Sequence, residues 1–402
     1  MSTPGSSRHE HGFTRHEGRA THCLFENQLT GESLRLLDPV ARITVHRRAE
    51  LPAAWDAIET ARRAGRWIAL LLDYELGEWF GPETADAVDH EQHDRLPRMT
   101  ALIHAGAERR SDGPRNATGP ASRGRHHMPP WHPRPRPAIS RDHHAQAIDI
   151  IRAGIAQGDY YQINYTLPLH LDWPAGLDPV HVYAHLSGQH PIAHAACIRD
   201  GDRWVLSMSP ELFVAREGDQ LRVRPMKGTA PRHADPARDR QAAETLQRCA
   251  KNRAENLMIV DLLRNDLGRI AVPGSVHVPA LFSLEAYPSV WTMTSTIEAK
   301  APDIPLADVL RALFPCGSVT GAPKIAAMRA IRTLEARRRG IYCGSVGWLA
   351  PDGDFSLNVA IRTIELRDGQ AEFGVGGGIV YDSQAADEWE ECLWKARILN
   401  PD

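Results

Sequence analysis

Long hydrophobic runs are missing from this sequence. None of its apolar stretches reaches the roughly 18 residues that a membrane-spanning helix needs, and residues 1–20 lack the apolar core of a signal peptide. The net charge at pH 7 is only −3, which gives no sign of a nucleic-acid-binding surface or of an acidic tail. We therefore expect a cytoplasmic protein with no membrane and no nucleic-acid partner.

Cysteines are few and widely spaced. The six of them form no CxxC pair, and they stand at positions 23, 197, 249, 316, 343 and 392. This scatter favours free thiols in a reducing compartment over a disulfide framework or a zinc site. The chain has 402 residues, of which 42% are hydrophobic and 24% charged, so it is long enough for one large domain or two ordinary ones.

The composition divides the chain into four parts. Residues 1–20 are polar, and we expect them to be disordered. Residues 21–103 contain an amphipathic helix and a buried strand, and they predict the N-terminal part of an α/β fold. Residues 104–140 are rich in Pro, Arg and His and predict a linker or loop. From 141 to 402 helix and strand patterns follow one another closely, and we expect the catalytic region there.

Strand-like and helical patterns alternate in the dense region. A helix is predicted to end at Gly158. The stretches RWVLSMSP and ELFVAREGDQLRVRP alternate with period two, and we expect them to pair as antiparallel neighbours. Residues 341–381 predict a three-stranded meander, and a last helix follows. Such an order indicates an α+β fold of layered antiparallel sheets flanked by helices, rather than a doubly wound parallel sheet.

A lysine stands where one of the strand patterns ends. Residues 221–226 alternate as a strand, whereas Gly228 and Pro231 predict that the chain turns and that the strand stops. Lys227 is therefore expected at a turn, beside a glycine that allows the backbone to approach a ligand closely.

Carboxylates on two predicted helices are candidates for a common site. Glu388, Glu391 and Lys395 are spaced so that all three can share one face of the last helix, although a solvated face with an ion pair explains them equally. Glu255 stands in the first turn of an earlier helix, where the helix dipole alone favours it. Together, such carboxylates could hold a hard cation such as Mg²⁺. Glu211, between two strands, could act as an acid if burial raises its pKa.

Glycines interrupt the strand that precedes the last helix. Gly376, Gly377 and Gly378 weaken that strand and indicate a place where a ligand meets bare backbone. Tyr342 and Arg362 are predicted on neighbouring strands of the meander, where a phenol and a guanidinium would suit a carboxylate. A structural salt bridge would explain the same arginine.

Five blocks of the sequence together resemble the chorismate-utilising enzymes, which include the anthranilate, aminodeoxychorismate, isochorismate and salicylate synthases. The blocks are SPELF (209–213), PMKGTAPR (225–232), AENLMIVDLLRNDLGR (254–269), GSVTGAPK (317–324) and VGGGIVYDSQAADEWEECLWKA (375–396). The resemblance is close over roughly residues 140–400 and loose over 23–100. It implies the fold of anthranilate synthase component I.

Two positions separate the branches of this family. The turn that reads P-I-A-G-T in anthranilate synthases and P-I-K-G-T in aminodeoxychorismate synthases is PMKGT here, with Lys227. Members that add water use a lysine in the strand after the first helix, and the matching residue here is Gln162, which cannot serve as that base. The resemblance therefore implies an amino-transferring member, an aminodeoxychorismate synthase component I. Anthranilate synthase component I is the alternative.

The resemblance also implies substrates and a partner. Chorismate and ammonia would give 4-amino-4-deoxychorismate, a precursor of p-aminobenzoate and folate. We find no glutaminase sequence in the chain, so the ammonia would come from a separate glutamine amidotransferase subunit. A regulatory protein that keeps the fold without catalysis is disfavoured because six of the family's functional residues are all present: Lys227, Glu211, Glu255, Glu391, Arg362 and Lys395.

Individual roles follow from the same resemblance. Lys227 would attack C2 of chorismate while the C4 hydroxyl leaves, Glu211 would protonate that hydroxyl, and Thr229 would position the substrate. The two substrate carboxylates would be held by Tyr342, Arg362, Gly376, Gly377, Gly378 and Lys395. Mg²⁺ would be bound by Glu255 and Glu391, with support from Glu388.

Two positions depart from the family's pattern. Thr292 stands where many relatives carry a histidine, and Asn252 stands where some carry an acidic residue near the metal.

Overall fold

The computed structural model of the chain describes residues 13–15, 21–81, 96–113, 131–287 and 290–400. Within these ranges the strands join one sheet, in which every pair of neighbours is antiparallel. The antiparallel pairing agrees with the predicted α+β class. None of the helices in the described ranges combines the length and the hydropathy that a membrane span requires.

The sheet can be followed from neighbour to neighbour through the whole molecule. In order of hydrogen bonding its main strands are β7 (Gln162–Leu171), β19 (Gln370–Ile379), β18 (Thr363–Arg367), β9 (Arg203–Ser209), β8 (His194–Asp200), β2 (Thr21–Asn27), β3 (Glu32–Val45), β5 (Met99–Ser111), β4 (Trp67–Leu72), β16 (Ser345–Leu349), β17 (Phe355–Asn358), β10 (Leu212–Glu217), β11 (Gln220–Arg224), β14 (Val290–Lys300) and β13 (His277–Ala286). Shorter strands lie beside these: β1 (Phe13–Arg15), β6 (Arg136–Pro137), β12 (Met226–Pro231) and β15 (Gly321–Ala322).

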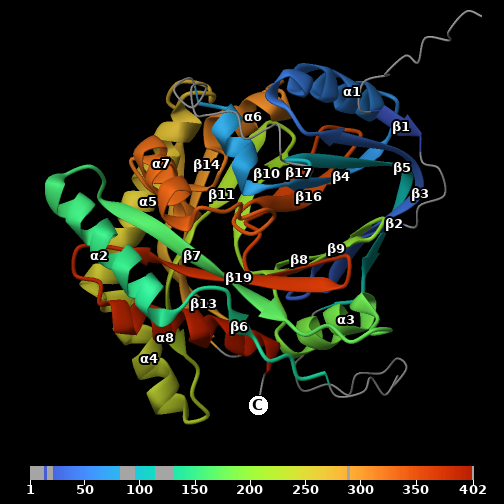
Figure 1. Cartoon of the computed structure of the whole chain (residues 1–402). Coiled ribbons are helices and arrows are strands. Elements are labelled where there is room, and N and C mark those ends of the chain that lie inside the picture. Colours follow the sequence, from blue (N-terminus) through green and yellow to red (C-terminus); the bar gives the residue numbers. More distant parts are fainter. Residues whose placement is uncertain (1–12, 16–20, 82–95, 114–130, 288–289, 401–402) are drawn as a thin grey trace, which may run out of the picture.

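This path curls back on itself, so that its two ends meet. β7 and β19 run side by side across the molecule (Figure 1), while β12 pairs with β14 near the other end of the path. A β-carbon placed on Gly378 of β19 would nevertheless lie only 3.6 Å from Nζ of Lys227 on β12. The curl therefore brings together residues that the sheet separates by many strands.

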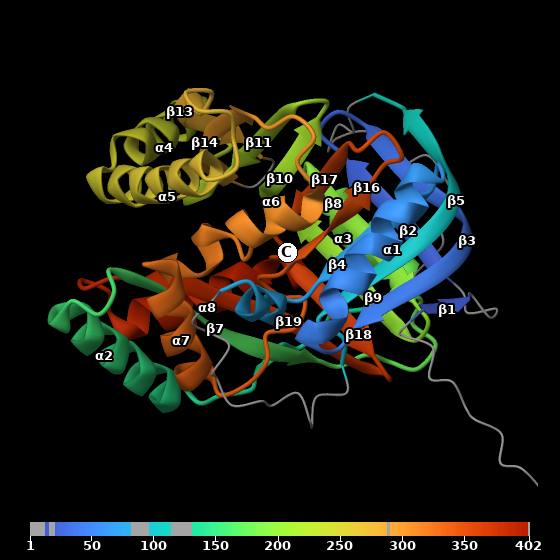
Figure 2. The same ribbon diagram turned by 90° about the horizontal axis from the view of Figure 1, so that it is seen from above.

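Helices cover this curled sheet. They are α1 (Leu51–Arg63), α2 (Arg141–Gln157), α3 (Pro179–Gln189), α4 (Pro236–Arg248), α5 (Ala250–Gly268), α6 (Leu306–Leu313), α7 (Lys324–Glu335) and α8 (Ala385–Lys395). α4 and α5 pack together against β13 and β14 (Figure 2), whereas α8 packs on β19 and α7 on β7. α2 ends as predicted, with Gly158 in the left-handed conformation at φ +84°.

The largest apolar core lies between the sheet and these helices. Ile68 of β4, Ile163 of β7, Leu263 of α5 and Ile331 of α7 all belong to it. The same core thus contains residues from both the N-terminal part and the region after 141. The N-terminal strands are also joined to the later ones by hydrogen bonds, because β4 pairs with β16 and β2 pairs with β8.

Two predicted boundaries need correction. β5 continues to Ser111, past the start of the 104–140 segment, because residues 106–111 pair with β3. Residues 114–130 of that segment lie outside the described ranges. Of the N-terminal residues 1–20, the structure describes only β1, which pairs with β3 rather than being disordered. The predicted disorder of the others concerns residues outside the described ranges.

Two predicted strand pairings are also wrong. β9 pairs with β8 and β18, while β10 forms its hairpin with β11, so RWVLSMSP and ELFVAREGDQLRVRP are not neighbours. The segment 341–381 contains four strands instead of three, and β17 does not pair with β18. The reason is that residues 359–362 carry the chain from one part of the sheet to another, with Arg362 in the left-handed region at φ +50°.

Candidate active site

Three side chains of α8 converge on the glycine-rich part of β19. A β-carbon on Gly377 would lie 3.1 Å from Oε2 of Glu388, 3.7 Å from Oε1 of Glu391 and 3.9 Å from Nζ of Lys395. The predicted shared helix face is therefore confirmed. Any side chain larger than hydrogen at position 377 would occupy the space that these charged groups now surround.

The ionisation of Glu388 and Glu391 depends on burial and on the charges around them. Lys395 Nζ contacts Glu391 Oε1 at 2.7 Å and donates to the carbonyl oxygen of Gly376 at 2.6 Å. Burial and the charge of Glu391 raise the pKa of Glu388, against the opposing effect of Lys395. Burial alone would raise the pKa of Glu391 too, but Lys395, Lys227 and Lys251 lower it. The two carboxylates are therefore close enough for the charge of Glu391 to disfavour ionisation of Glu388, while the nearby lysines keep Glu391 ionised.

Glu255 lies on a different helix, and it is only partly buried. It follows Lys251 by one turn of α5, and the charge of Lys251 reaches both Glu388 and Glu391. Within the described ranges, however, no three Asp, Glu, His or Cys side chains are grouped closely enough to hold a metal ion. The structure therefore brings Glu388 and Glu391 together but does not add Glu255 to them.

This donor set still fits Mg²⁺. Mg²⁺ in proteins is commonly bound by one or two carboxylates, and waters and substrate oxygens complete its octahedral shell. Glu388 and Glu391 supply two carboxylates next to bare backbone, where space for a substrate oxygen remains.

A buried acid lies close enough to Lys227 to feel its charge. Glu211, in the junction between β9 and β10, is only 3% exposed. Its Oε1 accepts a hydrogen bond from Ser318 Oγ at 2.7 Å and a longer one from the backbone N–H of Met226 at 3.4 Å. Burial raises the pKa of Glu211 to about 7, although Ser318, Lys227 and Met226 each lower it. The carboxyl can therefore carry a proton near neutral pH, as an acid catalyst must.

Lys227 and Glu211 both contact Ser318. Nζ of the lysine donates to the carbonyl oxygen of Ser318 at 3.2 Å. The predicted turn at this lysine is wrong: β12 continues through it, with a bulge between Met226 and Thr229 and with Gly228 at φ +83°. The bulge provides the extra residue that changes where the lysine side chain points.

Gln162 lies beside the same glycine as Lys227. A β-carbon on Gly378 would lie 2.1 Å from Gln162 Nε2, so the amide packs directly on the glycine backbone. The Gln162 side chain is buried, and its Oε1 has no hydrogen-bond partner in the described part of the chain. It is an acceptor available to a ligand.

Tyr342 and Arg362 approach from outside any strand. Tyr342 precedes β16, and its ring covers Gly374, whose β-carbon would lie 2.2 Å from Tyr342 Cγ. Arg362 separates β17 from β18, and burial lowers the pKa of its guanidinium while Tyr287 opposes that change. Among the residues that the structure describes, no carboxylate forms an ion pair with Arg362. The prediction of neighbouring strands is wrong, but an unpaired guanidinium suits an external carboxylate.

Thr229 and Thr292 face each other across the pairing of β12 with β14. Thr229 is exposed, and nothing in its surroundings ties it to Lys227. Thr292 is buried, and its hydroxyl has no partner within the described ranges. The departure from the histidine of many relatives thus leaves a small polar group at the edge of the site. Asn252 packs against Gly228, with Cγ 3.0 Å from the β-carbon position.

Ser318 and Gly374 are the residues of this site that sequence reasoning missed. Ser318 is inside the GSVTGAPK block, but a serine near a helix start carries no signal of its own. Gly374 stands two positions before the glycine run and accommodates the ring of Tyr342.

Comparisons with known proteins agree with this geometry. The sequence profile of a family described as chorismate binding enzyme matches residues 20–401. Aminodeoxychorismate synthase component 1 of Salmonella typhimurium is 43% identical over 265 residues, which cover 65% of this chain and 58% of that protein. Anthranilate synthase component 1 of Streptomyces coelicolor is 41% identical over 250 residues, or 62% of this chain and 48% of that protein. The matches therefore span about half of each relative's length.

A solved structure shows the fold independently. Anthranilate synthase component I of Streptococcus pneumoniae superposes with a TM-score of 0.73 at 22% identity, covering 98% of this chain and 95% of that one. The predicted fold of the anthranilate synthase component I type is confirmed.

Titration of the buried acid gives a test of its environment. In the folded protein the pKa of Glu211 is raised from 4.5 to about 7, so folding disfavours the ionised form. The stability that this group contributes is complete below pH 4.5 and is lost as the pH rises towards 7. Glu211→Gln removes that dependence. The free energy of unfolding of the variant, relative to that of wild type, should therefore rise by about 3 kcal/mol between pH 4.5 and pH 7.

Denaturant unfolding at several pH values measures the difference. Glu217→Gln is the control, because Glu217 belongs to the following strand and its side chain is 74% exposed. A difference between Glu211→Gln and wild type that stays constant from pH 4.5 to pH 7 would contradict the raised pKa.

Proposed function

The chain belongs to the family of chorismate binding enzymes, and we propose that within it the chain aminates chorismate as an aminodeoxychorismate synthase component I. The observation that carries this proposal is the position of Lys227. Its amine lies against the backbone of Gly378 and shares Ser318 with the buried acid Glu211. A nucleophile and an acid are thus held on one side of a surface that has no side chain of its own.

The chemistry requires both groups. In the proposed reaction Lys227 Nζ forms a bond to C2 of chorismate, both ring double bonds shift, to C1=C6 and C4=C5, and the C4–oxygen bond breaks. The departing hydroxyl takes the proton of Glu211 and leaves as water, which is a general-acid step worth about 10²–10⁴-fold in rate. Ammonia then adds at C4 and returns a proton to Glu211, both double bonds move back, and the neutral lysine amine is released from C2. No carbon is lost, so no pyruvate is formed.

The remaining residues bind the substrate in this proposal. Arg362 and Tyr342 hold the enolpyruvyl carboxylate, since within the described ranges the guanidinium is desolvated by burial and no carboxylate forms an ion pair with it. Thr229 orients the substrate towards Lys227. Lys395 and the backbone of the glycine run face the ring carboxylate. This arrangement would fix the ring with C2 towards Lys227, which is the kind of positioning that makes attack effectively unimolecular.

Mg²⁺ completes the proposed site. Glu388 and Glu391 would bind it, with Glu255 approaching from α5, and the bound ion would neutralise the substrate's ring carboxylate. Without a cation, that carboxylate would meet two glutamates of the same sign.

We further propose a partner and a location. Ammonia would be supplied by a glutamine amidotransferase subunit, in keeping with the name component 1 of the relatives. All six cysteines are free thiols in the structure, which supports work in the reducing cytoplasm.

Anthranilate synthesis is the second candidate because one relative of similar identity is an anthranilate synthase component 1. That reaction must also eliminate pyruvate and aromatise the ring. Lys227 and its shared loop with Glu211 favour amination at C4 instead.

Removing the amine tests its role. Lys227→Ala should lower the rate of chorismate amination by at least about 10²-fold, or leave only a slow direct addition of ammonia. The product is quantified by mass spectrometry after incubation with ammonium and Mg²⁺. The control is Lys300→Ala, because Lys300 is an exposed lysine at the end of the neighbouring strand β14. Full activity of Lys227→Ala would exclude the covalent step.

Removing a carboxylate tests the metal site. Glu391→Gln should lower activity and, at the same time, raise the Mg²⁺ concentration needed for half-maximal rate by about 10-fold or more. Glu390→Gln is the matched control on the same helix, since the Glu390 side chain is 65% exposed and pairs with Arg141. An unchanged Mg²⁺ titration of Glu391→Gln would remove Glu391 from the set of ligands.

A further inference from the structure

A buried ion pair lies directly behind the loop that carries Ser318. Glu335 at the end of α7 and Arg339 are each only 1% exposed, and their side chains form two contacts, at 2.7 and 2.9 Å. Buried pairs of this kind are weak evidence for stability, because desolvation offsets much of the attraction. The contacts that the pair makes with neighbouring backbone groups give another reason for its position.

The pair holds two segments of the site through their backbones. Arg339 Nη1 donates to the carbonyl oxygen of Val319 at 2.9 Å, and Nη2 donates to that of Asn164 at 2.6 Å. Glu335 Oε1 accepts from both the backbone N–H and the hydroxyl of Thr166, each at 2.9 Å. Val319 ends the 3₁₀ turn η5 (Gly317–Val319), and the other two residues belong to β7.

Both segments carry groups of the site. In η5, Ser318 precedes Val319 and contacts Glu211 through its hydroxyl and Lys227 through its carbonyl oxygen. In β7, Gln162 lies two residues before Asn164 and packs on Gly378. The planar guanidinium of Arg339 therefore sets the distance between η5, which contacts Lys227 through Ser318, and β7, which carries Gln162.

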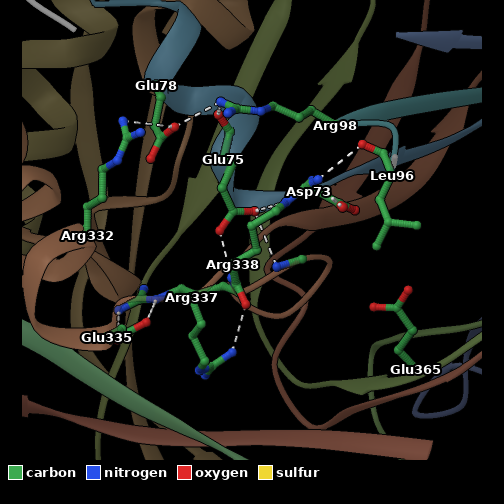
Figure 3. Close-up of polar contacts among 12 residues, drawn as sticks. Asp73, Glu75, Glu78, Leu96, Arg98, Arg332, Glu335, Arg337, Arg338 and Glu365 are labelled. Carbon is green, nitrogen blue, oxygen red and sulfur yellow. Dashed lines mark hydrogen bonds and ion pairs between the residues drawn. The ribbon is translucent and has the colours of Figure 1, made fainter. Parts of the chain in front are cut away.

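Residues of the N-terminal part hold the Glu335–Arg339 pair in place. The backbone N–H groups of Arg339 and Gly340 donate to the two carboxylate oxygens of Glu75, at 2.6 and 3.2 Å. Glu75 belongs to η2 (Tyr74–Trp79), and the guanidinium of Arg339 also lies 4.4 Å from the ring centre of Tyr74. Figure 3 shows the arginine-rich segment after α7 reaching Glu75 from the side of Glu335. The N-terminal part of the chain thus contacts the residue that holds the loop.

We infer that Arg339 and Glu335 are positioning residues for the reaction, which act by holding Ser318 against Glu211 and Lys227. The inference rests on the proposed function for its catalytic meaning, but its structural content stands apart from it. Lysine at position 339 would keep the charge but could not donate along the separate directions of the guanidinium fork. The carbonyl oxygen of Val319 would then lose its hydrogen bond from the guanidinium, whereas the bond from the backbone N–H of Asn164 to the carbonyl oxygen of Thr320 would remain.

Hydrogen–deuterium exchange tests the structural content directly. In Arg339→Lys the amides of residues 316–320 should exchange faster than in wild type, because the turn is no longer held. Arg203→Lys is the matched control: Arg203 is also a buried arginine paired with carboxylates, Asp73 and Glu365, and it contacts neither η5 nor β7. Equal exchange of this segment in Arg339→Lys and wild type would overturn the inference, whatever the enzyme makes.

The pH profile of chorismate consumption tests the catalytic content, whichever product forms. Glu211 faces Lys227 and Cys316 as titratable neighbours, and its acid role requires the protonated form, so activity should fall as the pH rises past the pKa of Glu211. Losing the hydrogen bond from Ser318 should move this descending limb up by about 0.7 pH unit, the equivalent of one hydrogen bond. Ser318→Ala supplies that reference shift.

Arg339→Lys should reproduce the shift of Ser318→Ala and lower kcat about 10-fold, with less effect on KM. The double variant should show no additional shift, and Arg203→Lys should leave the limb in place. The inference would be overturned if the descending limb of the pH profile moved in Ser318→Ala but not in Arg339→Lys. It would also be overturned if the double variant showed the sum of the two single shifts. Should Arg339→Lys fail to fold, Glu335→Gln gives the same comparison with a change of charge alone. An anthranilate product would overturn the proposed function while leaving these comparisons decisive.

Discussion

The arrangement of the site depends on a stretch of β19 that has almost no side chains. Gly374 accommodates the ring of Tyr342, Gly377 faces the charged groups of α8, and Gly378 receives Gln162, each at a distance that a β-carbon would make impossible or tight. Glycine weakens a strand, because it adds no packing and loses much entropy on folding. The pairing of β19 with β7 along nine residue pairs compensates for that weakness.

The curl of the sheet explains why these glycines become a site. β19 lies near one end of the hydrogen-bonded path and β12 near the other, and the strands between them come from both halves of the chain, including β2 to β5. Where the ends meet, one face of the glycine strand receives carboxylates from α8 and the neighbouring position receives the amine of Lys227. Lys395 pairs with Glu391 there and the charge of Lys227 also reaches Glu391, so charges of both signs meet beside bare backbone.

Much of this could be predicted from the sequence, because local patterns determine it. The helix ending at Gly158 and the shared face of Glu388, Glu391 and Lys395 followed from spacing, and the place of Glu211 between two strands followed from the strand patterns. What failed depended on contacts between distant segments. The partners of β9 and β10, and the bulge at Lys227, are decided by where other strands arrive. The part played by Ser318 could not be seen either, since its neighbours are 107 and 91 residues away.

We propose that the chain adds ammonia to chorismate and keeps its enolpyruvyl group. The most direct measurement is mass spectrometry of the product that the purified chain forms from chorismate with Mg²⁺ and a high ammonium concentration. The account predicts aminodeoxychorismate without release of pyruvate. Anthranilate together with pyruvate would contradict the role given to Lys227, and isochorismate or salicylate would contradict the conclusion that Gln162 excludes water as the nucleophile.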